Sequence, residues 1–292
     1  MKECYMYAFV LATMFVLNLY LLVPTSVSKL PRYNERQIKW RILSVIITCS
    51  IGIISYPYIF CNGFVGFDVF DLQINRLIFA PVKHVMKLYL GSFIASVLES
   101  HATFQLQSSN ILYINFMYVQ FVTKLIRPFR CSKFQVARDL IIAPFAEELI
   151  FRSLMISPML HSTEYLTENM TIWKICLTVP LFFGLAHVHH AYTKIVHDNV
   201  PVSKAIMSSG FQFIYTYLFG AYASFCYIKT KSLVSIYAVH MLCNYLSLPN
   251  ISIFIVETKS LKNVNVYRAI ASFSYMIGIY FFYHGFQSSF AF

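Results

Sequence analysis

The chain alternates long apolar runs with short polar segments, which is the pattern of a polytopic membrane protein. A run of about 18 or more apolar residues is long enough to cross a bilayer as a helix. The predicted membrane-spanning segments are residues 5–23, 42–60, 139–156, 172–187, 205–228, 233–256 and 267–286. Two shorter apolar runs, 82–98 and 111–125, flank a polar piece around His101. We therefore expect an all-α, polytopic integral membrane protein with about eight transmembrane helices.

The distribution of charge between these runs predicts their orientation. Segments 28–41 and 124–138 are rich in Lys and Arg, whereas segment 158–171 is acidic and polar. Because basic loops stay on the cytosolic side of a membrane, both basic segments are expected in the cytosol and the acidic one in the lumen. Between residues 62 and 124 this requires an odd number of crossings, which one span and one re-entrant or interfacial segment would satisfy.

Composition agrees with a membrane protein and leaves little room for a soluble domain. Of the 292 residues, 58% are hydrophobic and only 12% are charged, against about 25% charged in soluble domains. The net charge of +11 is explained by the basic loops, so we expect membrane lipid and no nucleic acid as a partner. The seven cysteines form no CxxC pair and no metal-type spacing.

Two adjacent carboxylates interrupt the apolar run at 139–156. Glu147 and Glu148 are followed by Arg152, although a charge at bilayer depth costs about 3 kcal/mol or more unless it is paired or faces water. Glu148 and Arg152 are four residues apart, so they can pair on one helix face. Glu147 lies about 100° round the helix from Glu148. Glu148 is therefore expected to neutralise Arg152, which leaves Glu147 for chemistry.

Two further pairs with helical spacing lie in later apolar runs. Phe183 and His187 are four residues apart, as are His240 and Asn244, so each pair shares a helix face. Taken singly, each feature has a structural explanation: a clamp between helices, a histidine at the membrane interface, or hydrogen bonding between helices. Together, in one small membrane protein, they favour a site. His189 and His190, which follow His187, are expected to be interfacial.

These side chains suit hydrolysis. A carboxylate in an apolar pocket suits a general base, so Glu147 could deprotonate a water that His187 helps to hold. His240 and Asn244 could donate hydrogen bonds to the developing oxyanion. The sequence contains neither H-E-x-x-H nor G-x-S-x-G. A thiol mechanism through Cys243 is conceivable, and so is a metal held by Glu147, His187 and His240. The spacing demands neither, so no cofactor is expected.

The three motifs resemble those of the type 2 CAAX prenyl proteases, the Ras-converting enzyme family. That family is marked by E-E-x-x-x-R, F-x-x-x-H and H-x-x-x-N in this order, and the chain has all three. Residues 182–190, Phe-Phe-Gly-Leu-Ala-His-Val-His-His, resemble the eukaryotic members closely. The resemblance covers about residues 138–250 and divides the single membrane domain into an N-terminal region, 1–137, a catalytic core, 138–250, and a C-terminal helix region, 251–292.

The resemblance implies an endopeptidase of the endoplasmic reticulum membrane with its active site inside the bilayer and open to the cytosol. It implies cleavage after a farnesylated or geranylgeranylated cysteine of a C-terminal CAAX sequence, which releases the last three residues. The implied catalytic residues are Glu147, His187, His240 and Asn244, with Glu148, Arg152 and Phe183 in support. The alternatives are a metal-dependent membrane protease using the same residues and a non-enzymatic membrane scaffold of the same superfamily. The intact motifs argue against the scaffold.

Overall fold

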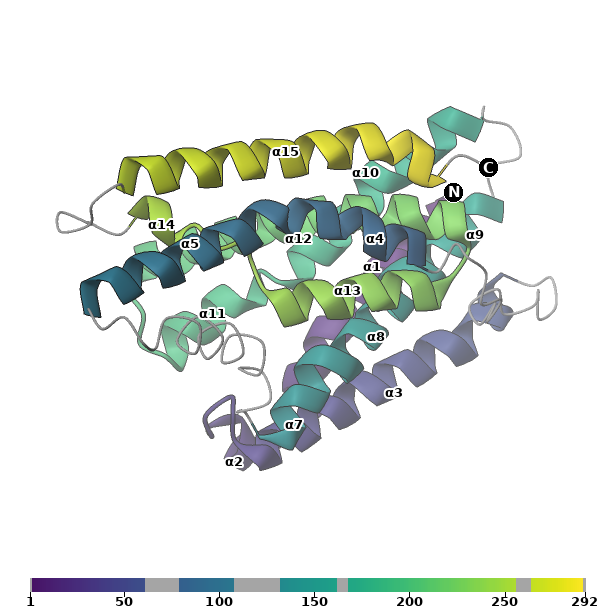
Figure 1. The fold of residues 1–292 in the computed structure, drawn as a ribbon. Coiled ribbons are helices and arrows are strands. Elements are labelled where there is room, and N and C mark those ends of the chain that lie inside the picture. The colour runs from purple at the N-terminus through teal and green to yellow at the C-terminus, as the bar shows by residue number, and fades with distance from the viewer. Residues whose placement is uncertain (1, 61–78, 108–131, 162–167, 256–263, 291–292) are drawn as a thin grey trace. The chain divides into compact units, whose positions relative to one another are not determined.

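The computed structural model describes residues 2–60, 79–107, 132–161, 168–255 and 264–290. Within these ranges the chain forms helices joined by short turns, and no strand occurs (Figure 1). The all-α prediction is therefore confirmed. The described chain divides into two compact units. The first combines Met1–Asn75 with Ala137–Ala238, and the second combines Arg76–Val136 with Val239–Phe292.

The first unit is built around the helix that carries the two glutamates. Its helices are α1 (Lys2–Leu21), α2 (Thr25–Ser28), α3 (Glu35–Ile59), η5 (Ala137–Ile142), α8 (Ala143–Glu148), η6 (Leu149–Leu154), α9 (Met155–His161), α10 (Glu168–Ala186), α11 (His189–Val196), α12 (Val202–Thr230) and the first turns of α13 (Leu233–Leu246). Segment η6 touches α1, α3, α10 and α12, while α10 packs along α12. All six residues of η6 are buried, so the helix after the glutamates is the core of this unit.

The glutamate helix is not a regular α-helix. Segments η5 and η6 are wound as π-helix on either side of α8. Pro144, in the first turn of α8, has no backbone N–H, so the regular hydrogen-bond ladder cannot run through it. Wider π turns relieve this interruption, and they are frequent at functional sites. Glu147 and Glu148 thus lie at the end of a short α-helical turn between two irregular ones.

The second unit is dominated by two long helices that run side by side, α5 (Leu90–Gln107) and α15 (Val264–Phe290) (Figure 1). Its other helices are α4 (Phe79–Met86), η3 (Lys87–Tyr89), α7 (Lys133–Val136), α14 (Ser252–Ile255) and the remainder of α13. Gly278 allows close approach, because a Cβ atom there would lie 2.6 Å from the carbonyl oxygen of Lys87. The Asn250 amide links the segment after α13 to α5 by donating to Glu99 at 2.8 Å.

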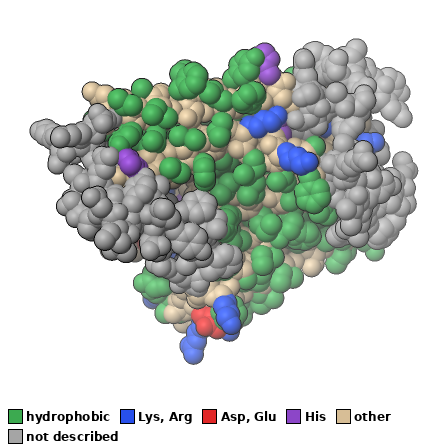
Figure 2. All heavy atoms as spheres, viewed as in Figure 1, with side chains coloured by type: hydrophobic (Ala, Val, Ile, Leu, Met, Phe, Trp, Pro, Cys, Tyr) green, Lys and Arg blue, Asp and Glu red, His purple; other side chains and the backbone are tan. Residues whose placement is uncertain are grey.

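Three helices in the described residues are long and apolar enough to cross a membrane: Lys2–Leu21, Glu35–Ile59 and Ile172–Val196. A shorter apolar helix is Leu233–Leu246. Figure 2 shows apolar side chains spread over the visible face, with few charged ones among them. Soluble monomers rarely expose large apolar patches, whereas lipid covers them in a membrane protein. The total of about eight spans stays a prediction, and the run 111–125 lies outside the described residues.

Two sequence-based element predictions were wrong in their boundaries. The predicted spans 172–187 and 205–228 leave only a loop between them, but α11 occupies His189–Val196. The run 233–256 was expected to be one span, but α13 ends at Leu246, and α14 is a separate turn. Ser247 adopts a left-handed conformation with φ of 62°, and Pro249 follows it. A residue in the left-handed conformation ends a helix, and a proline does not continue one. The helix therefore ends at Leu246, although the apolar run continues to residue 256.

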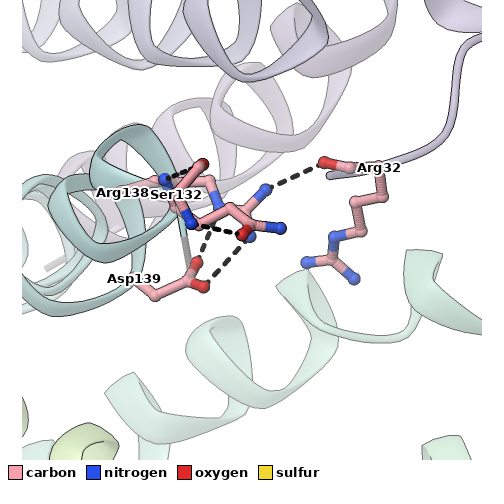
Figure 3. Close-up of polar contacts among 5 residues, drawn as sticks. Arg32, Ser132, Arg138 and Asp139 are labelled. Atoms are coloured by element: carbon pink, nitrogen blue, oxygen red, sulfur yellow. Dashed lines mark hydrogen bonds and ion pairs between the residues drawn. The ribbon is translucent and has the colours of Figure 1, made fainter. Parts of the chain in front are cut away.

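Two arginines of the first unit, one from each basic segment, lie side by side. Arg138 donates a hydrogen bond from Nη1 to the backbone oxygen of Arg32, at 3.0 Å (Figure 3). Near the start of α1, Cys4 donates to the backbone oxygen of Pro158, at 3.5 Å, so the beginning of the acidic segment lies beside the opposite end of α1. This arrangement supports placing both basic segments on one side of the membrane, and their assignment to the cytosol remains a prediction.

Candidate active site

A buried ion pair lies directly after Glu147 in the first unit. The side chains of Glu148 and Arg152 are 0% and 1% exposed, and Oε2 lies 3.2 Å from Nε. This is the pairing that their spacing predicts. The Arg152 guanidinium also lies over the ring of Phe183, 4.4 Å from its centroid, and 5.8 Å from that of Phe219. Its nitrogens have no hydrogen-bond partner in the described part of the chain, so a carboxylate and two aromatic faces hold the cation.

Phe183 connects this ion pair to the candidate catalytic histidine. The ring of Phe183 is 1% exposed and lies edge-on to that of His187, with centroids 4.7 Å apart. The backbone oxygen of Phe183 lies 2.8 Å from Nδ1 of His187. Because a carbonyl oxygen only accepts, Nδ1 must carry the proton, and neutral His187 then keeps a free lone pair on Nε2. The F-x-x-x-H spacing thus brings the two rings together, and the bond to the backbone oxygen sets the tautomer of the neutral histidine.

Glu147 lies beside the ion pair and is partly exposed. Its carboxylate acts electrostatically on Arg152, more weakly than that of Glu148 does. It also acts on Tyr215 of α12, a neighbour that no motif indicated, because α12 is distant in sequence. Arg152 therefore influences both carboxylates, with Glu148 as its main partner.

The candidate site residues of the first unit fall into two groups by burial. Glu148, Arg152 and Phe183 are buried, whereas Glu147 and His187 are partly exposed. A side chain that reacts with substrate or water must be reachable, and one that holds the scaffold need not be. The burial pattern therefore agrees with the predicted division between catalytic and supporting residues, while the roles themselves remain proposals.

His240 and Asn244 lie on the part of α13 that belongs to the second unit. Their spacing predicts that both lie on one helix face. His240 is buried, but Asn244, one turn further along and close to the helix end, is exposed. Their approach to Glu147 and His187 stays a prediction. Cys243 lies beside the hydroxyl of Tyr89, within the second unit.

His189 and His190 extend the histidine cluster from His187 towards the basic end of the first unit. Nδ1 of His189 donates to the backbone oxygen of Ala186 at 2.5 Å. The ring of His190 lies 4.1 Å from that of His189 and 5.8 Å from that of His187, centroid to centroid. Both side chains are half-buried. The sequence placed them at the membrane interface but gave no sign that His190 would lie beside His187.

Comparison with known proteins identifies the family. A family model described as type II CAAX prenyl endopeptidase Rce1-like matches residues 131–246. CAAX prenyl protease 2 of Arabidopsis thaliana is 31% identical over 258 residues, which cover 82% of this chain and 78% of that protein. The chain belongs to the type II CAAX prenyl endopeptidase family. The CAAX prenyl protease 2 of Homo sapiens is 39% identical over 112 residues, or 38% of this chain and 32% of the human protein. No solved structure matches the chain.

Membership of the CAAX prenyl endopeptidase family makes the chain a hydrolase of peptide bonds. The matched range, 131–246, contains all three motifs and every candidate site residue. Helices α1 and α3 precede this range, yet α1 is linked to Phe183 through one aromatic residue. Phe15 of α1 packs edge-on to Phe151 at 5.6 Å, and Phe151 in turn contacts Phe183 at 5.1 Å.

Proposed function

We propose that this CAAX prenyl endopeptidase removes the last three residues of prenylated CAAX proteins by direct attack of a water molecule. The relatives named CAAX prenyl protease 2 support the substrate class. The bond from His187 Nδ1 to the backbone oxygen of Phe183, 2.8 Å long, carries the mechanistic part, because it leaves Nε2 free to accept a hydrogen bond from water. Glu147, partly exposed beside the buried ion pair, is the general base.

In the proposed reaction, water is held between the Glu147 carboxylate and Nε2 of His187. Glu147 takes a proton as the water oxygen attacks the carbonyl carbon of the prenylated cysteine. The carbonyl oxygen becomes an oxyanion, which His240 and the Asn244 amide stabilise as donors. Glu147 then returns the proton to the leaving amine as the C–N bond breaks. The products are a protein with a C-terminal prenylcysteine and a free tripeptide.

The ion pair positions these groups. Arg152 of η6 packs over Phe183 of α10, and Phe183 contacts His187 directly. This contact fixes α10 against the helix that carries Glu147. Small displacements of catalytic groups cost large factors in rate, so a rigid, buried connection between the two helices serves the reaction without touching the substrate.

The proposed setting is the endoplasmic reticulum membrane, with the site open to the cytosolic side. A prenyl chain is already dissolved in the bilayer, so it can enter between helices while the peptide reaches the site from the water phase. The meeting of the two basic segments, through Arg32 and Arg138, supports a single basic side of the first unit. His187, at the end of α10, lies towards that side, since His189 follows it and contacts Tyr20 near the end of α1.

The test uses purified protein in phospholipid vesicles and a farnesylated peptide that ends in a CAAX sequence. Mass spectrometry should detect the free tripeptide and the shortened farnesyl peptide in equal amounts. The same peptide without its farnesyl group should be cleaved much more slowly. Absence of tripeptide from folded protein with either farnesylated or geranylgeranylated peptide would favour the non-enzymatic scaffold. Loss of cleavage on chelation, with recovery on adding a metal, would favour the metal-dependent protease.

A further inference from the structure

Three guanidinium groups come together at the basic end of the first unit. They belong to Arg32 before α3, Arg41 in the second turn of α3, and Arg138 in η5. Arg138 is paired, because Nε and Nη2 donate to the two carboxylate oxygens of Asp139 at 2.6 Å and 3.0 Å (Figure 3). Arg41 differs: among the described residues, the charged groups that act on it are Arg32 and Arg138, together with the Tyr20 hydroxyl, and none of these is a carboxylate.

Two buried nitrogen atoms in this region lack a hydrogen-bond partner within the described ranges. They are Nε of Arg41 and Nδ1 of His190. Arg32 and Arg41 both act electrostatically on His190, so the two nitrogens share one positively charged neighbourhood. Buried polar atoms without partners are rare in folded proteins and are costly. An arginine N–H and a neutral imidazole N–H together fit a carboxylate or a phosphate oxygen.

The region around His190 and Arg41 lies close to the candidate catalytic residue His187. The ring of His190 is 5.8 Å from that of His187, and Arg41 lies within electrostatic reach of His190. A tripeptide in extended conformation spans about 10 Å. A substrate whose scissile bond lies at His187 would thus bring its C-terminal carboxylate into the region of His190 and Arg41.

The orientation of membrane helices gives a simpler reason for arginines at this end. That rule explains why basic residues are numerous here, and Arg36, exposed one turn earlier on α3, fits it fully. It does not explain why Nε of Arg41 is buried without a partner. A charge that serves orientation alone is better placed in water, so the burial of the Arg41 Nε atom points to a ligand.

Building on the proposed function, we propose that Arg41, assisted by Arg32 and His190, binds the C-terminal carboxylate of the substrate. The distance between this carboxylate site and the catalytic residues would then select substrates with three residues after the scissile bond. The Arg41 guanidinium donates to the carboxylate oxygens, and His190 donates from Nδ1. Arg32, exposed at the edge of the cluster, adds positive charge that attracts the peptide terminus.

The experiment compares two farnesylated peptides of identical sequence, one with a free C-terminal carboxylate and one with a C-terminal amide. Wild-type protein in phosphatidylcholine vesicles should cleave the carboxylate peptide with a kcat/KM about ten- to a hundredfold higher, the worth of a charge-assisted hydrogen bond. In Arg41→Gln this ratio should fall to near one, and Arg41→Lys, which keeps the charge, should retain part of it. Arg36→Gln, on the same helix, is the matched control and should keep the full ratio.

Other results of this experiment would contradict either the carboxylate site or the proposed function. A wild-type ratio near one, or an Arg41→Gln variant that melts normally and keeps the wild-type ratio, would overturn the carboxylate site. If Arg41→Gln lowered cleavage of both peptides equally, and only in vesicles containing phosphatidylserine, the cluster would bind a lipid phosphate and the proposal would fail. If wild-type protein cleaved neither peptide, the proposed function itself would fail, which separates the two hypotheses.

Discussion

Removing the Glu148 carboxylate should destabilise the protein far more than removing an exposed carboxylate of the same spacing. In Glu148→Gln the Arg152 guanidinium, whose side chain is 1% exposed, would keep its charge without its main partner. Breaking a buried pair in this way costs about 3–5 kcal/mol. We expect the lower part of that range, because the carboxylate of Glu147 also acts on Arg152 and two aromatic faces hold the guanidinium.

An exposed ion pair of the same spacing provides a control for this measurement. Glu35 and Lys39 form another i, i+4 ion pair, 2.6 Å long, but their side chains are 55% and 56% exposed. Such a pair contributes about 0.3–0.5 kcal/mol, so Glu35→Gln should be nearly neutral. The free energy of unfolding would be measured by titrating SDS into mixed micelles. Replacing both buried partners, as Glu148→Leu with Arg152→Met, should recover most of the loss. Equal stability of Glu148→Gln and Glu35→Gln would refute the buried-charge reasoning.

Three further predictions follow from the site. Phe183→Leu should lower kcat at least about tenfold and stability by about 2 kcal/mol, because it removes the cation–π contact and the ring beside the histidine; Phe219→Leu, measured alongside, should affect stability only. Cys243→Ala should retain most activity, and metal analysis of active protein should find no stoichiometric zinc; inactivity of a folded Cys243→Ala would revive the thiol mechanism. Cysteines placed singly at Ser132 and Ser162 in an active Cys-free background should show opposite labelling by an impermeant thiol reagent in sealed microsomes: position 132 labelled, position 162 spared. The reverse pattern would contradict the predicted orientation.

The sequence correctly predicted contacts between residues one helical turn apart. The spacing of Glu148 and Arg152 predicts their ion pair, which forms at 3.2 Å, and the spacing of Phe183 and His187 places both on one face, where their rings touch. Such local contacts survive the irregular winding of η5 and η6, although no pattern in the sequence announced those π turns. Apolar runs also identified the long helices α1, α3, α10, α12 and α15, because burial and lipid both select apolar side chains.

Contacts between segments that are distant in the sequence could not be predicted from the sequence. The approach of Tyr215 to Glu147 depends on how α12 packs, and the neighbourhood of Arg41 and His190 depends on how α3 meets the region after α10. A single sequence contains no signal for such pairings. The end of α13 was missed for a different reason: residues 247–256 remain apolar enough to continue a span, so only the backbone conformation at Ser247 reveals the break.

The central claim is that Glu147 is the base and Glu148 is not. The most direct measurement is tripeptide release from a farnesylated CAAX peptide by Glu147→Gln and Glu148→Gln, each assayed with its unfolding curve on the same preparation. The amide is nearly isosteric with the carboxylate but cannot take a proton from water. Glu147→Gln should therefore remain as stable as wild type and lose at least about a hundredfold in kcat, while folded Glu148→Gln keeps measurable turnover. A stable Glu147→Gln that releases tripeptide at the wild-type rate would contradict the account.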